Sequence, residues 1–205
     1  MTVLPPLHDS LLRAVRREQA TRRGRGRGRR LRRGALALAG AIALSGTAVA
    51  ATQVAKSLDA AVRAGERPPA PQAQRRLPLI GEPGTASLTR WRGQLVVLAF
   101  VASWCPPCEQ TMPALAAVGA DLRRRGEGTV VLVGVQDAAR DARAFVRGQP
   151  LRMPALADRD GTLARAYGTP GIPSIYAIDR DGRVVAIRRG QTGERALRAL
   201  VAKAR

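Results

Sequence analysis

Apolar positions along the C-terminal two thirds of the chain follow two different periods. Apolar runs at residues 95–101 and 129–135 are typical of strands buried on both faces. Between them, apolar residues recur at steps of three and four, which is the period of one helix face; they are Met112, Leu115, Ala116, Gly119 and Leu122. The pattern predicts a helix over about 108–125 that joins the two strands as a right-handed parallel crossover.

The following segments continue this alternation of strands and helices. A second helical pattern runs near 138–147 and is ended by Gly148 and Pro150. Two further apolar segments, 174–178 and 183–188, flank an Asp-Gly turn, so a direct antiparallel hairpin is expected there. A closing helix is expected from about 192 to 202.

These elements together predict one α/β domain over residues 77–205. Its strands would form a mixed central β-sheet flanked by helices, and its length suffices for a core of that kind. Aromatic residues make up only 3% of the chain. We therefore expect the core to consist of Leu, Val, Ile and Ala.

Both cysteines of the chain lie between the first predicted strand and the first predicted helix, in the stretch Trp104-Cys105-Pro106-Pro107-Cys108. Cys105 would then lie at a helix N-terminus, where unpaired N–H groups and the helix dipole favour a thiolate. The two prolines fit a first helical turn, which needs no N–H donors. We expect Cys105 to be the exposed nucleophile and Cys108 to be shielded.

Other chemistry at this cysteine pair is disfavoured by composition. A zinc site needs about four ligands, whereas the chain offers two cysteines and the distant His8, so no metal is expected. A purely structural disulfide would close too short a loop to constrain the unfolded chain much. Residues 77–205 contain no histidine, so Cys–His and Ser–His–Asp hydrolase schemes lack a base. Thiol redox chemistry, which needs no further cofactor, is the favoured interpretation.

Residues 77–205 resemble thioredoxin-like proteins of the TlpA/ResA/DsbE type, which are membrane-tethered thiol:disulfide oxidoreductases. The resemblance implies the thioredoxin-like fold. Four features in the same order carry it: Ser103-Trp104-Cys105-Pro106-Pro107-Cys108, Pro113, Tyr167-Gly168 followed by Gly171-Ile172-Pro173-Ser174, and Asp179-Arg180-Asp181-Gly182.

The resemblance also implies roles for particular residues. Cys105 and Cys108 would exchange a disulfide with client proteins that carry thiols or disulfides, and a membrane electron donor of the CcdA/DsbD type would be a second partner. Pro173 would be cis and face the cysteines, a geometry that only an X–Pro bond adopts readily; a trans proline opening a strand is the alternative. Trp104, Ile172 and Pro173 would bind the client, although Trp104 could instead serve packing alone.

Two positions depart from relatives of this kind. Ala99 stands where thioredoxin carries a buried Asp, and Thr111 stands where the cytochrome c maturation branch carries a Glu. Glu109, beside Cys108, is interpreted as a solvated helix residue. An oxidant of exported proteins is therefore the alternative to a role in cytochrome c maturation. A peroxiredoxin-like peroxidase is disfavoured because Ala102 replaces a threonine, and a non-catalytic, membrane-displayed binding module is disfavoured by the intact cysteine pair.

The N-terminal part of the chain has the composition of a membrane anchor. The chain carries a net charge of +20, and eleven arginines against two acids give residues 1–33 a net charge of +9. Residues 34–55 contain no charge, and their 22 positions match the ~20 that a membrane helix needs. The positive-inside rule then predicts a basic cytoplasmic tail at 1–33, a transmembrane helix at 34–55 and an exported C-terminal domain.

Two further interpretations apply to this region. The small residues Ala48-Val49-Ala50 before Ala51 are typical of signal-peptide cleavage, which would release a secreted domain instead. Residues 56–76, with Pro68-Pro69-Ala70-Pro71, are interpreted as a juxtamembrane linker. The arginine-rich residues 22–30 have no interleaved aromatics and precede an apolar span, so topology and lipid attraction explain them better than a nucleic-acid partner.

Overall fold

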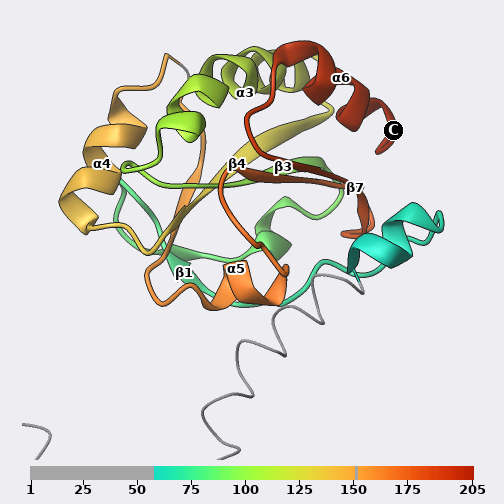
Figure 1. The fold of residues 1–205 in the computed structure, drawn as a ribbon, viewed down its shortest axis with the longest axis horizontal. Helices are drawn as coiled ribbons and strands as arrows, with labels where there is room; N and C mark the ends of the chain where they lie inside the picture. Colours follow the sequence, from blue (N-terminus) through green and yellow to red (C-terminus); the bar gives the residue numbers. More distant parts are fainter. Residues whose placement is uncertain (1–57, 151) are drawn as a thin grey trace, which may run out of the picture. The chain divides into compact units, whose positions relative to one another are not determined.

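The computed structural model describes residues 58–150 and 152–205. Its centre is a five-stranded sheet with strand order β5-β4-β3-β6-β7 (Figure 1). β3 lies in the middle, parallel to β4 and antiparallel to β6, so the predicted mixed sheet is confirmed. The strands are β3 Leu95–Val101, β4 Gly128–Val135, β5 Ala155–Asp158, β6 Ser174–Ile178 and β7 Val184–Arg189.

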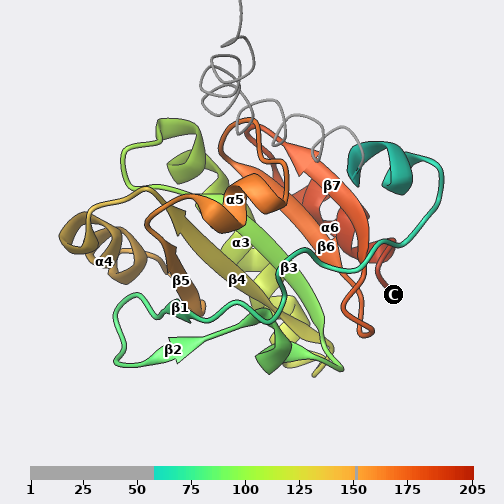
Figure 2. The same ribbon diagram turned by 90° about the horizontal axis from the view of Figure 1, so that it is seen from below.

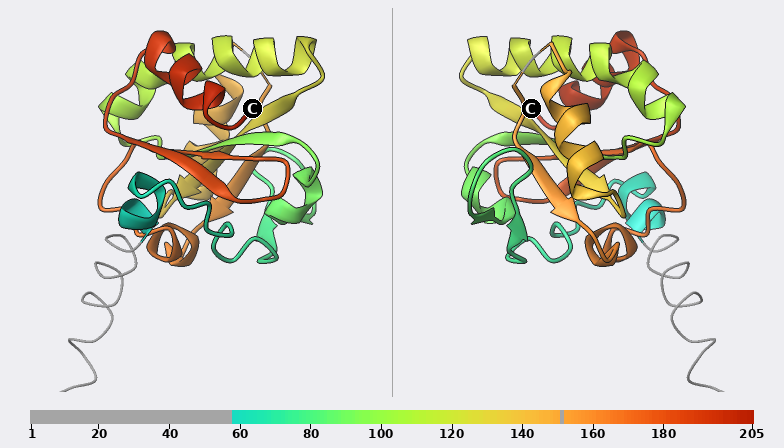
Figure 3. Two further views of the ribbon diagram at one scale, coloured as in Figure 1. Left: turned by 90° about the vertical axis from the view of Figure 1, so that its right-hand side faces the viewer. Right: turned by 90° about the vertical axis from the view of Figure 1, so that its left-hand side faces the viewer.

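Helices cover both faces of this sheet, as Figure 3 shows. One face packs against α3 Pro106–Arg124, α4 Ala139–Arg147 and α6 Glu194–Ala202. The other face packs against α5 Thr162–Ala166 and the 3-10 turn Leu88–Trp91. The small strands β1 Leu77–Pro78 and β2 Thr85–Ala86 pair beside β5, which Figure 2 shows from below. This arrangement is the thioredoxin-like α/β fold.

The elements with a strong apolar period were predicted correctly. β3 has the predicted bounds, and α3 joins it to the parallel strand β4. β6 and β7 form the predicted antiparallel pair, with a register shift at Ala177/Ile178. β5, α5 and the β1–β2 pair were not predicted, because each is at most five residues long and too short to display a period.

An aromatic cluster lies on the face of the sheet opposite α3. Phe100, Tyr167 and Tyr176 are fully buried, and their ring centroids lie 4.9 to 5.6 Å apart in tilted or edge-on pairs. They are the three bulkiest fully buried side chains of the described residues. The expectation of a core made only of Leu, Val, Ile and Ala was therefore wrong on this face. Aromatic residues are few in the chain, but three of them are concentrated at one place.

The segment interpreted as a linker is packed against the domain. Residues 58–63 are helical and are called the leading helix below. Leu58 and Ala70 are buried in the aromatic face of the core. The Pro68 carbonyl accepts a hydrogen bond of 2.8 Å from the amide of Val184, the first residue of β7. The folded unit therefore begins before the predicted boundary at residue 77, and composition alone could not show the contacts that hold this segment.

The predicted basic tail at 1–33 and the predicted span at 34–55 lie outside the described residues. Across 58–150 and 152–205, no helix is long and apolar enough to cross a membrane.

Candidate active site

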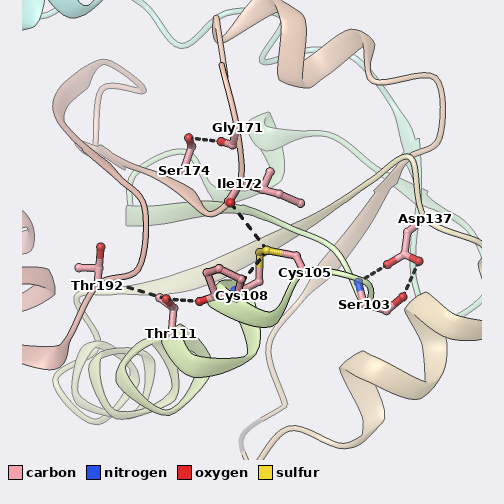
Figure 4. Close-up of a disulfide and its surroundings, with 10 residues drawn as sticks. Ser103, Cys105, Cys108, Thr111, Asp137, Gly171, Ile172, Ser174 and Thr192 are labelled. Atoms are coloured by element: carbon pink, nitrogen blue, oxygen red, sulfur yellow. Dashed lines mark hydrogen bonds between the residues drawn. A yellow bond between two sulfur atoms is a disulfide. The ribbon is translucent and has the colours of Figure 1, made fainter.

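A disulfide between Cys105 and Cys108 closes the N-terminal turn of α3 (Figure 4). Cys105 is the N-cap residue of the helix, and the two Cα atoms are 5.2 Å apart. The backbone N–H of Cys108 points at the Cys105 sulfur, with an N–S distance of 3.2 Å. Pro106 and Pro107 occupy the first helical positions, where no N–H donor is needed. The predicted placement of Cys105 at a helix N-terminus is confirmed.

The two cysteine residues differ slightly in burial. Cys108 is fully buried, whereas Cys105 is 5% exposed. The expected order is thus correct, but Cys105 was expected to be exposed and is largely covered. One reason is the loop opposite the disulfide, because the Ile172 carbonyl oxygen lies 3.7 Å from the Cys105 sulfur. After reduction, the Cys105 thiol could donate a hydrogen bond to this oxygen.

That opposing loop contains the Ile172–Pro173 bond, which is cis as the resemblance implies. The Ser174 hydroxyl donates to the Gly171 carbonyl at 2.6 Å, and the Gly190 amide donates to the Pro173 carbonyl at 2.8 Å. These contacts fix the loop on both sides of the proline. The structure therefore brings the cysteine pair and the predicted client-binding residues of this loop together.

Trp104 is the large hydrophobic side chain that stands out on the surface of the described residues. It is 61% exposed and immediately precedes Cys105. An indole exposed to this degree gains little from packing within the domain, so packing alone does not account for it. Its role in client binding stays a prediction.

Thr111 lies one turn beyond Cys108 and is fully buried. Its hydroxyl donates to the Pro107 carbonyl at 2.9 Å and accepts from the Thr192 amide at 3.3 Å. The hydroxyl is thus engaged on both sides and connects α3 to the loop before α6. Glu109 is exposed, as expected of a solvated helix residue. Sequence reasoning singled out Thr111 but not its partner Thr192, which is 81 residues away.

Asp137 is a site residue that sequence reasoning missed. Its carboxylate accepts two hydrogen bonds of 2.7 Å from Ser103, one from the backbone N–H and one from the hydroxyl (Figure 4). Ser103 follows β3 and Asp137 follows β4, and the ends of these neighbouring parallel strands meet at one edge of the sheet. That topology was predictable, so the pairing of the two strand ends was the available signal. Asp137 anchors the loop that presents Trp104 and Cys105.

The surroundings of the disulfide suit thiol exchange and show no metal site. Within the described ranges, no group of three His, Cys, Asp or Glu side chains is placed to hold a metal ion. Ala99 and Ala102 are fully buried in the same apolar cluster as the two cysteines. The disulfide itself is the chemically reactive group at this place.

Comparison with known proteins places this fold and site in context. The profile of the AhpC/TSA family matches residues 69–187. The thiol-disulfide oxidoreductase ResA of Bacillus thuringiensis subsp. konkukian is 27% identical over 104 residues, covering 51% of this chain and 60% of that protein. The chain thus spans well under two thirds of that relative's length.

Two solved structures are similar over about two thirds of this chain. A candidate thiol:disulfide interchange protein DsbE from Chlorobium tepidum has a TM-score of 0.60 and 30% identity, covering 67% of this chain and 96% of that one. The dsbF protein of MTB, solved in mixed oxidised and reduced forms, has a TM-score of 0.59 and 27% identity, covering 67% and 99%. Both support the resemblance to thioredoxin-like proteins of the TlpA/ResA/DsbE type.

Proposed function

This chain belongs to the AhpC/TSA family, and from that premise we propose that it is an extracytoplasmic thiol:disulfide oxidoreductase acting on client proteins. One observation carries the proposal. The Cys105–Cys108 disulfide lies at the N-terminus of α3, directly opposite the carbonyl of Ile172 in the cis-proline loop. The names of the similar proteins, ResA, DsbE and dsbF, support the same activity.

The exchange proceeds in two steps, the formation and the resolution of a mixed disulfide. In the reducing direction, the Cys105 thiolate attacks a client disulfide, forms a mixed disulfide and releases one client thiolate. Cys108 then loses its proton and attacks the Cys105 sulfur, which leaves the second client thiolate and the Cys105–Cys108 disulfide. The oxidising direction is the reverse of these steps. The N–H of Cys108, aimed at the Cys105 sulfur, favours the thiolate that the first step needs.

Client binding uses the surface around this sulfur. An extended client segment can pair with the backbone beside Pro173, because the Ile172 carbonyl already faces the disulfide. The exposed indole of Trp104 supplies an apolar contact on the other side of Cys105. No metal or organic cofactor enters these steps.

In the reducing direction, each turnover leaves the chain oxidised. A membrane electron donor of the CcdA/DsbD type would restore the dithiol, and disulfides of exported proteins, such as oxidised apocytochrome c, would be the clients. The arginine-rich residues 1–33 and the uncharged residues 34–55 support the proposed location, a single-pass anchor with an exported domain. A secreted domain released at Ala51 is the alternative. A working disulfide suits either location.

A second candidate, an oxidant of exported proteins, is favoured by one observation. Neither Ala99 nor Thr111 supplies a carboxylate beside the buried Cys108, whereas the reducing relatives described above carry an acid at one of these positions. The reduction potential of the couple, measured against glutathione, separates the two candidates. A value near or below that of thioredoxin, about −270 mV, supports the reductant, and a value well above it supports the oxidant.

The activity is tested with the full chain in detergent micelles. It should accelerate the reduction of insulin by dithiothreitol, and Cys105→Ser should not. Consumption of hydrogen peroxide without turnover of insulin would replace the proposal with a peroxidase. Binding of client proteins with no turnover of either substrate would replace it with a binding module.

A further inference from the structure

The hydroxyl of Tyr176 connects three parts of the domain. It donates to the Tyr167 carbonyl at 3.1 Å and lies 3.1 Å from the Thr169 hydroxyl. The guanidinium of Arg189, at the end of β7, donates to the same oxygen at 3.1 Å. Arg189 also donates to the carboxylate of Asp59 in the leading helix at 2.8 Å. A continuous set of hydrogen bonds therefore runs from the leading helix to Thr169.

Thr169 lies at the start of the loop that carries the cis proline. Ile172, three residues later, presents its carbonyl to the Cys105 sulfur. The other side of the loop is held by the same end of β7, because the Gly190 amide donates to the Pro173 carbonyl. Both ends of the loop are therefore held by residues at the end of β7, Arg189 through Tyr176 and the following Gly190 directly.

The positive charge of Arg189 is paired with the negative charge of Asp59. Burial opposes the positive charge of Arg189, but the Asp59 carboxylate and the Tyr176 hydroxyl outweigh it and raise the pKa of Arg189. The side chains of Arg189 and Asp59 are each about one quarter exposed, so their pairing is partly shielded from water. Burial also raises the pKa of Tyr176, which keeps its hydroxyl proton available for the Tyr167 carbonyl.

We propose that Tyr176 and Arg189 are positioning residues for the client-binding loop, and that Asp59 makes the leading helix part of this support. The inference rests on the proposed function, because it assigns a role in client exchange. The network from Asp59 to Thr169 takes no part in the two exchange steps themselves. The segment that leads into the domain sets the geometry of the loop through Arg189 and Tyr176.

Tyr167 offers a matched control for a test of Tyr176. Its ring packs edge-on against Tyr176 with centroids 4.9 Å apart, but its buried hydroxyl has no hydrogen-bond partner among the residues that the structure describes. Tyr176→Phe and Tyr167→Phe therefore remove the same atom from neighbouring rings of one cluster. Only the first removal breaks the connection to Thr169 and Arg189.

The first measurement is the kinetics of insulin reduction by the full chain. Tyr176→Phe should raise KM about 5- to 10-fold, as expected from the loss of one or two hydrogen bonds that hold the bound geometry. The rate of Cys105 alkylation by iodoacetamide should not fall, because the sulfur and the N–H of Cys108 are untouched and a looser loop covers the sulfur less. Tyr167→Phe should leave both quantities at the wild-type level. Equal KM values for the two variants would overturn the proposal, as would an alkylation rate that falls together with the client reaction.

The second measurement does not depend on activity. Amide hydrogen exchange of residues 168–174, followed by mass spectrometry, should be faster in Tyr176→Phe than in Tyr167→Phe. Asp59→Ala should give a smaller acceleration, and Asp59→Glu should restore part of the protection. If the wild-type chain does not reduce insulin, the proposed function fails but this exchange difference still tests the positioning role. Unchanged exchange in all four variants would rule that role out.

Discussion

The two sulfurs of the Cys105–Cys108 disulfide lie in different surroundings. Cys105 faces polar backbone groups, the N–H of Cys108 at 3.2 Å and the carbonyl of Ile172 at 3.7 Å. Cys108 is fully buried in an apolar cluster, and Thr111, one turn away, has its hydroxyl engaged with other groups. In the proposed exchange, the first step therefore depends on how loops present Cys105. The second depends on how a proton leaves an apolar pocket.

Replacing each cysteine separately by alanine should give the largest difference in activity between two variants. Cys105→Ala should abolish turnover, because the sulfur that attacks the client is gone. Cys108→Ala should retain the first step and accumulate mixed disulfides with clients, since resolution is blocked. Non-reducing electrophoresis followed by mass spectrometry checks this. Accumulation in Cys105→Ala alone would mean that the roles are reversed, and so would faster labelling of Cys108 by iodoacetamide.

An acid placed near Cys108 should change the second step. Thr111→Glu puts a carboxylate on the helix face of Cys108, where it could take the thiol proton directly or through water. Resolution of a mixed disulfide should become faster near neutral pH, with a different pH profile. Stopped-flow resolution of a preformed mixed disulfide measures this.

Thr111→Val is the matched control, because it keeps the shape but removes the hydroxyl. It should lower the free energy of unfolding by about 1–2 kcal/mol, since the Thr192 amide loses its acceptor. Its resolution profile should match the wild type. An unchanged profile in Thr111→Glu would show that water or another group already removes the proton.

For the first exchange step, the hydrogen bonds from Ser103 to Asp137 should matter more than an added proton acceptor near Cys108. Asp137→Ala removes both acceptors of Ser103 and should lower the free energy of unfolding by about 2 kcal/mol. The attack of Cys105 on insulin should slow, whereas the resolution step should keep its rate and pH profile. Ser103→Ala loses only the hydroxyl bond and should have a smaller effect. Equal slowing of both steps by Asp137→Ala would contradict a role confined to Cys105.

Asp158 shows how this fold accommodates a buried carboxylate. It is fully buried and accepts the N–H groups of Leu163 and Ala164 in the first turn of α5. Burial outweighs these bonds and raises the pKa of Asp158 above 3.8. The native state therefore holds this proton more tightly than the unfolded chain. The contribution of Asp158 to the free energy of unfolding falls as the pH rises from about 4 through the raised pKa.

Asp158→Asn removes that titration. The variant should be destabilised by about 1–3 kcal/mol at low pH, because an amide supplies only one acceptor for two N–H groups. This deficit should shrink as the pH rises, and urea unfolding at several pH values measures it. A deficit that grows with pH would mean that the pKa of Asp158 is lowered rather than raised.

Local sequence signals predicted much of the fold and half of the site. The run at 95–101 and the helical period after Cys108 specify β3 and α3 without help from distant residues. The cysteine pair between them is equally local, whereas Ile172 and Pro173 were identified only through a family resemblance. The support of that loop was not predicted, because Asp59 and Arg189 are 130 residues apart and their pairing leaves no local pattern. The same reason explains why residues 58–76 were interpreted as a linker.

The exposure of Trp104 gives the protein a built-in optical probe. The chain has two tryptophans; Trp91 is 7% exposed and Trp104 is 61% exposed. Indole emission depends on contact with water, so a client that covers the Cys105 surface shifts the emission of Trp104 while Trp91 supplies a constant background. Association and release of a client can therefore be followed in real time on the unlabelled chain, with Trp104→Phe as the blank.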